Sequence, residues 1–282
     1  MKIANIILAH KNPTQLLTLL DQFDGRHFHH FIHIDQKSSI QDFKGIAERS
    51  HVTVLSKRRN LIWGGFGIVQ ATLDGLKTIT EARENYFYIN LMSGQDFPIK
   101  PPVDMYNFLF ESYENKAGEF FDIANLQQWP KQDWYQRVHL TNWTLSGRYF
   151  TENIINGLLP KREFYEGKLE PYGQSTWFTA TDKFIRYALH YLNDNPGYLK
   201  FLKTVMIPDE FIFNSLLMNS SFSENAKPNL RYIDWAENKI NPKTLRIEDF
   251  QNLASSNAFI ARKFDDTVDP DIINHMVSHI AR

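Results

Sequence analysis

A carboxylate and a pair of cations stand out among the residues of this chain because together they could carry out a sugar transfer. The carboxylate is Glu210, in Pro208-Asp209-Glu210-Phe211, and the cations are Arg262 and Lys263. A fixed carboxylate can take the proton from an attacking hydroxyl. Arginine offers a planar fork and lysine a point charge to a departing diphosphate. The three residues therefore predict a transfer that needs no metal.

Each of these segments also has a structural interpretation. Asp209 can cap a helix, and Glu210 can favour its positive N-terminal end. Arg262 and Lys263 can be a basic pair in solvent. If Glu210 is the base, we expect Asp209 to cap the helix.

The sequence contains little that would bind a metal at a diphosphate. Many nucleotide-sugar enzymes hold the metal with an Asp-X-Asp motif after a buried strand. At that place this chain has Ser93-Gly94-Gln95-Asp96, with one carboxylate. The only literal Asp-X-Asp, Asp269-Pro270-Asp271, is typical of a helix start. We therefore expect no metal and no other cofactor.

The strands and helices that must position these residues are expected to alternate along the chain, as in βαβ units. Apolar runs predict strands over residues 3–9, 28–35, 52–55 and 86–92 and a strand-like segment over 172–180. Helical spacing predicts helices that begin near residues 13, 68, 184, 209 and 269. This order predicts an α/β fold with a mainly parallel, twisted sheet flanked by helices. We expect one domain over 1–282, with a mainly nucleotide-binding half (1–100) and a mainly acceptor and catalytic half (101–282).

Polar residues follow three of the expected strands, and ligands bind at the carboxyl ends of such strands. His10, Asp35 and Asp96 should therefore share one rim. Asp35 can accept hydrogen bonds from uracil or ribose, and Asp96 can touch the donor sugar. Their structural alternatives are turn residues for the two carboxylates and a structural hydrogen-bonder for His10. Trp63, before Gly64-Gly65, can stack on uracil or pack in the core.

Aromatic residues make up 14% of the chain, which suits either a bulky core or a cleft that stacks on sugar rings. The stretch 125–150 is predicted to be a long excursion with broken helix. Candidate acceptor-binding residues are Trp134, Arg137, Trp143 and Trp177, with core packing as the alternative for each.

Composition excludes several classes of protein. The net charge is −1, so no global field would attract nucleic acid. Cysteine is absent, which excludes disulfides and thiolate chemistry and suits a reducing compartment. The apolar run 3–9 is too short for a signal peptide or a membrane span. We expect a cytoplasmic protein, with weak peripheral membrane contact through the Trp- and Lys-rich stretch 129–150 as a further expectation.

Six short segments, in order along nearly the whole chain, resemble the core-2 and I-branching β-1,6-N-acetylglucosaminyltransferases and the peptide O-xylosyltransferases. They are Ala9-His10-Lys11-Asn12-Pro13, His33-Ile34-Asp35-Gln36-Lys37-Ser38, Trp63-Gly64-Gly65-Phe66, residues 91–100, Pro208-Asp209-Glu210 and Ala261-Arg262-Lys263-Phe264-Asp265. The resemblance implies a GT-A-type fold, an inverting transfer and a UDP-sugar donor. It places the family's catalytic base at Glu210 and its phosphate-binding lysine at Lys263.

The chain lacks the membrane anchor and cysteines of the animal members, so it looks like a soluble bacterial member. N-acetylglucosamine is the first expectation for the sugar, followed by xylose or glucose, and the acceptor is expected to be a glycan or a lipid-linked glycan. Two alternatives stay open. One is a non-catalytic nucleotide- or glycan-binding protein on the same scaffold, and the other is a metal-dependent transferase.

Overall fold

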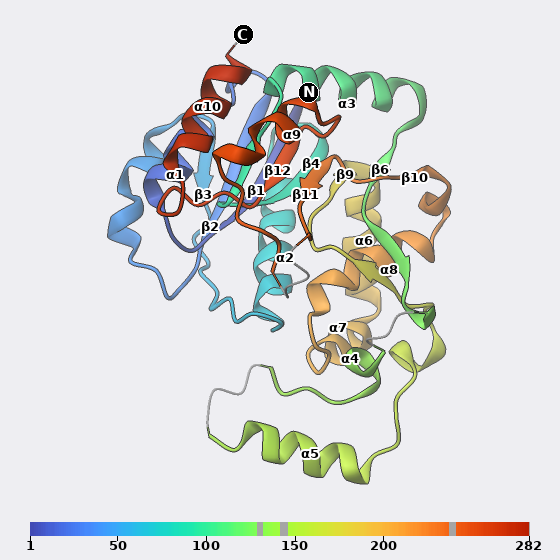
Figure 1. Ribbon diagram of the computed structural model, residues 1–282. Helices are drawn as coiled ribbons and strands as arrows, with labels where there is room; N and C mark the ends of the chain where they lie inside the picture. Colours follow the sequence, from blue (N-terminus) through green and yellow to red (C-terminus); the bar gives the residue numbers. More distant parts are fainter. Residues whose placement is uncertain (129–131, 142–145, 237–240, 282) are drawn as a thin grey trace.

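The computed structural model describes residues 1–281 apart from 129–131, 142–145 and 237–240. Its centre is a seven-stranded sheet with helices on both faces (Figure 1). The strands lie in the order β10 (Ala226–Lys227), β6 (Glu119–Phe120), β9 (Thr179–Thr181), β4 (Tyr86–Ser93), β1 (Lys2–Ala9), β2 (Phe28–Ile34) and β3 (Val52–Val54).

The sheet is mainly parallel, as predicted. β3, β2, β1 and β4 run in one direction, and β10 is parallel to β6. β9 is antiparallel to both of its neighbours, β4 and β6. The expected strands over 3–9, 28–35, 52–55 and 86–92 are confirmed to within two residues at each end.

A second, three-stranded sheet adds β5 (Asp96–Pro98) to two strands from the end of the chain, β12 (Ile260–Arg262) and β11 (Arg231–Ile233). β5 pairs with β12 in antiparallel fashion, and Arg262 stands opposite Asp96. This pairing brings together two segments that are more than 160 residues apart in the sequence. A third pairing joins β7 (Ile123–Asn125) to β8 (Tyr172–Gln174).

The strand expected over 172–180 is confirmed at its two ends only. β8 ends at Gln174 and β9 begins at Thr179, with a turn between them. The Ser175 hydroxyl accepts a hydrogen bond from the backbone N–H of Trp177, and Thr176 donates to a distant carboxylate. Local side-chain bonds of this kind compete with strand pairing, and they leave Thr176 and Trp177 free to face a cavity.

The helices are α1 (Pro13–Leu20), α2 (Gly67–Thr80), α3 (Pro102–Lys116), α4 (Asp133–Gln136), α5 (Arg148–Leu158), α6 (Asp182–Asp194), α7 (Pro196–Leu202), α8 (Ile212–Met218), α9 (Phe250–Ser255) and α10 (Pro270–Ile280). The Asp269 side chain accepts hydrogen bonds from the N–H groups of Asp271 and Ile272. The Asp-Pro-Asp segment is therefore a helix start, as predicted. No helix of the described residues is both long and apolar enough to cross a membrane.

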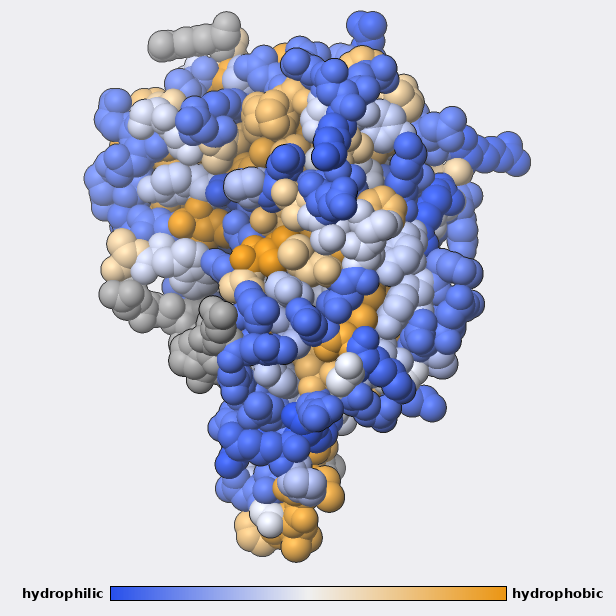
Figure 2. Space-filling view, turned by 90° about the vertical axis from the view of Figure 1, so that its right-hand side faces the viewer, coloured by the Kyte–Doolittle hydropathy of each residue, from blue (hydrophilic) through white to orange (hydrophobic). Residues whose placement is uncertain are grey.

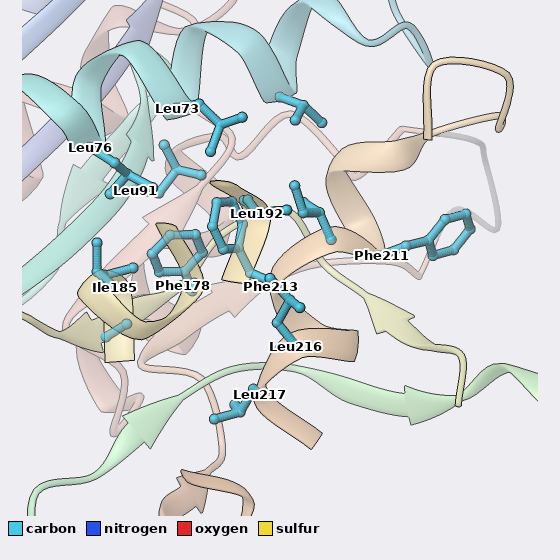
Figure 3. Close-up of a cluster of buried hydrophobic side chains, with 14 of the residues drawn as sticks. Leu73, Leu76, Leu91, Phe178, Ile185, Leu192, Phe211, Phe213, Leu216 and Leu217 are labelled. Carbon is cyan, nitrogen blue, oxygen red and sulfur yellow. The ribbon is translucent and has the colours of Figure 1, made fainter. Parts of the chain in front are cut away.

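Two hydrophobic clusters hold these layers together. In one, Leu76 of α2, Leu91 of β4 and Ile185 of α6 meet residues of α8 such as Leu216 (Figure 3). The other lies against α1, α3 and α10 on the remaining parts of the sheet. Each fully buried side chain of this size contributes about 1.5–3 kcal/mol relative to exposure. The strand ends that carry polar residues are thereby held in fixed positions.

Glu119, at the start of β6, makes the stability of the fold depend on pH. It is buried, and it accepts hydrogen bonds from Thr181 N at 2.8 Å and Thr181 Oγ1 at 2.5 Å. Burial raises the pKa of Glu119 from 4.5 to about 7, in spite of these bonds. The folded state thus binds the proton more tightly than the unfolded chain does, and the contribution of this group to stability falls as pH rises from 4.5 to about 7.

We expect Glu119→Gln to flatten the pH dependence of the unfolding free energy across this window, where one such group changes stability by at most about 1.4 kcal/mol per pH unit. Urea unfolding at several pH values measures the slope. The exposed Glu114→Gln is the control and should keep the wild-type slope. An unchanged slope in Glu119→Gln would show that another group titrates in this range.

Candidate active site

A cavity of about 550 Å³ opens where β1, β2 and β4 end. Its walls come from the ends of these strands, from the loop before α2, from the turn before β9 and from the end of β12. The lining residues include His10, Lys11, Asp35, Lys37, Trp63, Ser93, Thr176, Trp177, Asp209, Arg262 and Lys263. Six of the predicted site residues therefore meet at one cavity: His10, Asp35, Trp63, Trp177, Arg262 and Lys263.

The strand ends fix His10 and Asp35 as expected. Asp35 is 1% exposed, and its Oδ1 accepts a hydrogen bond from Lys37 N at 2.9 Å. His10 lies at the surface of the cavity, and burial together with the neighbouring Lys11 lowers its pKa. Trp63 is 53% exposed, so its ring is available to a flat ligand rather than packed in the core.

Arg262 is held rigidly at the back of the cavity. Its Nη1 lies 3.6 Å from Asp96 Oδ1, and its guanidinium carbon lies 4.2 Å from the centre of the Trp177 ring. Burial lowers the pKa of Arg262, and the Asp96 carboxylate opposes that effect. Because the guanidinium stacks on a ring and faces a carboxylate, it keeps one orientation toward the cavity.

Asp96 is not at the rim where the sequence placed it. It is fully buried, does not line the cavity, and accepts a hydrogen bond from Ser93 N at 3.1 Å. Burial raises the pKa of Asp96, whereas Arg262 and Arg231 lower it. β5 pairs with β12 in antiparallel fashion, and the buried Asp96 carboxylate lies against the Arg262 guanidinium rather than in the cavity.

Cations crowd the cavity beside Arg262. Burial lowers the pKa of Lys263, and the positive charges of Lys11 and Arg262 lower it further. Lys11 is tied to Asp265 by a bond of 2.5 Å. Lys37 lies 3.6 Å from Asp35. Cations that repel one another gain most when a multiply charged anion is placed among them.

The Pro208–Glu210 turn forms the wall next to Trp177. It is one turn of 3₁₀ helix, and α8 begins only at Ile212. Gly173 of β8 packs against this turn so closely that an added Cβ would lie 2.8 Å from the Glu210 carbonyl oxygen. Phe211 is anchored in the hydrophobic core beside the turn (Figure 3). The turn is therefore fixed on both sides.

The expectation that Asp209 caps a helix is wrong. Its Oδ2 accepts a hydrogen bond from Thr176 Oγ1 at 2.5 Å, and its side chain lines the cavity. Burial raises the pKa of Asp209 from 3.8 to about 6, although the bond from Thr176 lowers it. Glu210 is the next residue and is half-buried. Two adjacent carboxylates are thus held at or beside the wall that faces the cations.

Of the described candidate acceptor residues, only one lines the cavity. Trp177 lines the cavity. Trp134, a residue of α4, packs against the hydrophobic core, and Arg137 is exposed and lies 3.7 Å from Asp133. Neither Trp134 nor Arg137 lines this cavity. Trp143 lies outside the described residues.

A larger cavity of about 730 Å³ lies elsewhere, between α3 and the segments 227–232 and 256–258. Its walls are mostly apolar, and apart from Lys227, Arg231 and Glu111 its lining carries no charge. We assign the site to the smaller cavity because that cavity combines the predicted cations, carboxylates and exposed Trp63. No group of three His, Asp or Glu side chains suited to a metal occurs among the described residues.

Arg231 supports the site from within the core. Its Nη2 donates hydrogen bonds to the carbonyls of Leu91 and Phe178 at 2.8 and 3.0 Å and to Asn90 Oδ1, which links β4 to the segment before β9. Burial lowers its pKa to about 10. Sequence gave no signal for this residue, because its partners come from segments that are distant along the chain.

We expect Arg231→Met to lower the unfolding free energy by about 3 kcal/mol, because it removes three hydrogen bonds to buried acceptors and a positive charge that stabilises the buried Asp96 carboxylate. The shift in the urea midpoint, at unchanged slope, measures this loss. Arg186→Met removes an exposed pair with Asp182 and should change stability by less than about 1 kcal/mol. Equal effects of the two substitutions would contradict a stabilising role of the Arg231 hydrogen bonds between β4 and the segment before β9.

Sequence reasoning also missed Lys11, Lys37 and the cavity-facing role of Asp209. The two lysines could have been predicted, because Lys11 follows His10 and Lys37 lies two residues after Asp35, and both His10 and Asp35 were predicted to line the site. The position of Asp209 could not have been predicted from the sequence, because its side chain is oriented by Thr176, 33 residues away.

Comparisons with known proteins agree with the motifs. The family model described as Core-2/I-Branching enzyme matches residues 3–255. Xylosyltransferase 1 of Rattus norvegicus is 24% identical over 309 residues, which covers 99% of this chain and 35% of that protein. Xylosyltransferase of Ciona intestinalis is 23% identical over 306 residues, with 98% and 34% covered. The chain thus spans about a third of the length of these relatives.

Two solved structures resemble the fold. S. aureus TarS 1-349 aligns with 100% of this chain and 66% of its own, at a TM-score of 0.45 and 12% identity. Mouse xyloside xylosyltransferase 1, in its apo form, aligns with 93% of this chain and 97% of its own, at a TM-score of 0.42 and 9% identity. Because the family model covers most of the sequence, the chain belongs to the Core-2/I-Branching enzyme family.

Proposed function

We infer that this protein is an inverting glycosyltransferase that moves a sugar from a UDP-sugar to a hydroxyl of a glycan or a lipid-linked glycan, without a metal. The observation that carries the proposal is the cavity itself, which Arg262 and Lys263 line together with Asp209 of the Pro208–Glu210 turn. Family membership and the xylosyltransferase relatives support a sugar transfer. The GT-A-type organisation that the motifs imply fits a mainly parallel sheet with its site at the strand ends.

The chemistry is a single displacement. The acceptor oxygen forms a bond to the anomeric carbon while the bond from that carbon to the diphosphate oxygen breaks, which inverts the configuration. A carboxylate of the turn takes the proton from the attacking hydroxyl. The family's base falls on Glu210, and Asp209, held by Thr176, lines the cavity beside it.

Arg262 and Lys263 stabilise the diphosphate as negative charge builds on it. Asp96 and Trp177 keep the guanidinium in place, so little reorganisation is needed during the transfer. Asp35 is placed to accept hydrogen bonds from ribose or uracil, and exposed Trp63 to stack on the base. Lys11 and Lys37 add to the positive field of the cavity. Asp96, the lone carboxylate at the usual metal-binding position, faces Arg262 instead.

N-acetylglucosamine is the first choice for the transferred sugar, and the xylosyltransferase relatives make xylose the second. Donor hydrolysis across a panel of UDP-sugars, with and without excess chelator, tests the proposal. We expect turnover of one donor that survives the chelator. Activity lost to chelator and restored by manganese would identify a metal-dependent transferase. Binding of UDP without turnover of any donor or acceptor would identify a binding protein.

A further inference from the structure

Helix α5 exposes an unusual number of large apolar side chains. Tyr149, Phe150, Ile154 and Leu158 are 73%, 71%, 47% and 80% exposed. The helix lies at one end of the molecule, away from the sheet (Figure 1). Figure 2 shows hydrophobic residues gathered at the lower tip, where Figure 1 places α5. Leu159, directly after the helix, extends this surface and is 52% exposed.

The outward side of α5 carries no charge. The only charged residues of the helix are Arg148 and Glu152, which pair with each other at 2.9 Å. Glu152 is buried and also accepts a hydrogen bond from Leu140 N at 2.6 Å, so the pair faces the body of the protein. The remaining exposed residues are Asn153 and Gly157. Solvent therefore meets an aromatic and aliphatic face with no ionic group.

The helix is mounted firmly despite its exposure. The Asn156 side chain bonds both the N–H and the carbonyl of Val138, at 2.8 and 2.9 Å. Arg162, just beyond the helix, bonds the carbonyls of Tyr135 and Thr204 at 3.1 Å. These hydrogen bonds hold α5 in one orientation, with its apolar face toward solvent.

The size of the face argues against a second copy of the chain as its partner. The face consists of five exposed apolar residues, Tyr149, Phe150, Ile154, Leu158 and Leu159, whereas a stable protein interface contains about 20–30 residues on each side. Stable protein interfaces bury about 800 Å² on each partner. A lipid surface sets no such minimum, because it adapts its shape to each apolar side chain that enters it.

The chemistry of the face and its surroundings favours lipid. Tyrosine and phenylalanine side chains are favoured at the boundary between headgroups and acyl chains. Two exposed cations, Arg137 and Lys161, lie beside the helix and share the single carboxylate of Asp133. The excess positive charge suits anionic headgroups.

We propose that α5 docks the protein on a lipid bilayer as an interfacial helix, with Phe150, Ile154 and Leu158 entering the acyl boundary.

Flotation of the full chain with vesicles of phosphatidylcholine and phosphatidylglycerol tests this proposal. We expect wild type to float with the vesicles and Phe150→Asp/Leu158→Asp to lose at least about tenfold in partitioning, since each side chain carries more than about 1.4 kcal/mol of transfer energy. Val103→Asp/Ile247→Asp adds the same charge at exposed apolar sites away from α5 and should bind as wild type does. Circular dichroism spectra that match the wild type confirm that all variants are folded.

Three results would overturn the proposal. They are failure of wild type to bind vesicles, equal loss in both double variants, and a concentration-dependent dimer in sedimentation equilibrium that the α5 variant dissolves. Vesicle binding by a protein without transfer activity would refute the proposed function and leave the docking of α5 intact.

Discussion

Glu210→Gln is expected to lower kcat by about 10²–10⁴-fold, the usual worth of a general base, while UDP binds as tightly as in wild type. Glutamine keeps the size of the side chain but cannot accept the proton of the attacking hydroxyl. Steady-state transfer assays give kcat, and titration calorimetry with UDP gives the affinity. Unchanged kcat would show that Glu210 is not the base.

Asp209→Asn is the companion to this experiment, because the structure brings Asp209 to the cavity wall. With Glu210 as the base, Asp209→Asn changes the position of the turn and costs less than Glu210→Gln. The reverse order, with Asp209→Asn nearly inactive and Glu210→Gln active, would move the base to Asp209. The pKa of about 6 at Asp209 then predicts that kcat falls below that pH as the carboxylate is protonated.

Lys263→Gln is expected to lower kcat/KM by about 10²–10³-fold, the range seen when one donor to a developing anion is removed. Burial lowers the pKa of Lys263, and repulsion from the neighbouring Lys11 and Arg262 lowers it further. A bound diphosphate relieves that repulsion, so removal of Lys263 should weaken UDP binding as well. Lys263→Arg should restore part of the activity because it keeps the charge.

Lys77→Gln is the matched control for Lys263. Lys77 is an exposed residue in the last turn of α2, outside the cavity, so its loss should leave kcat/KM unchanged. Wild-type kcat/KM should also fall as salt is added, since ions screen the attraction between the cavity and the donor. Equal activity of Lys263→Gln and Lys77→Gln would place the diphosphate elsewhere.

The sequence by itself determined the first four strands of the sheet and the edge of that sheet that bears the site. Continuous apolar runs predict buried parallel strands because both faces of such a strand are covered. Once β1 and β2 are placed, chain direction alone puts His10 and Asp35 at the same edge. The six short motifs added the family and drew attention to Glu210 and Lys263.

Only the tertiary structure decided which side chains face the cavity. Asp96 is turned inward because β5 pairs with β12, which arrives from the far end of the chain. Asp209 faces the cavity because Thr176 holds it there rather than a helix end. Trp134 packs on the core instead of lining the site. Periodicity fixes local conformation, whereas the direction of a side chain in a turn depends on partners that only the assembled fold supplies.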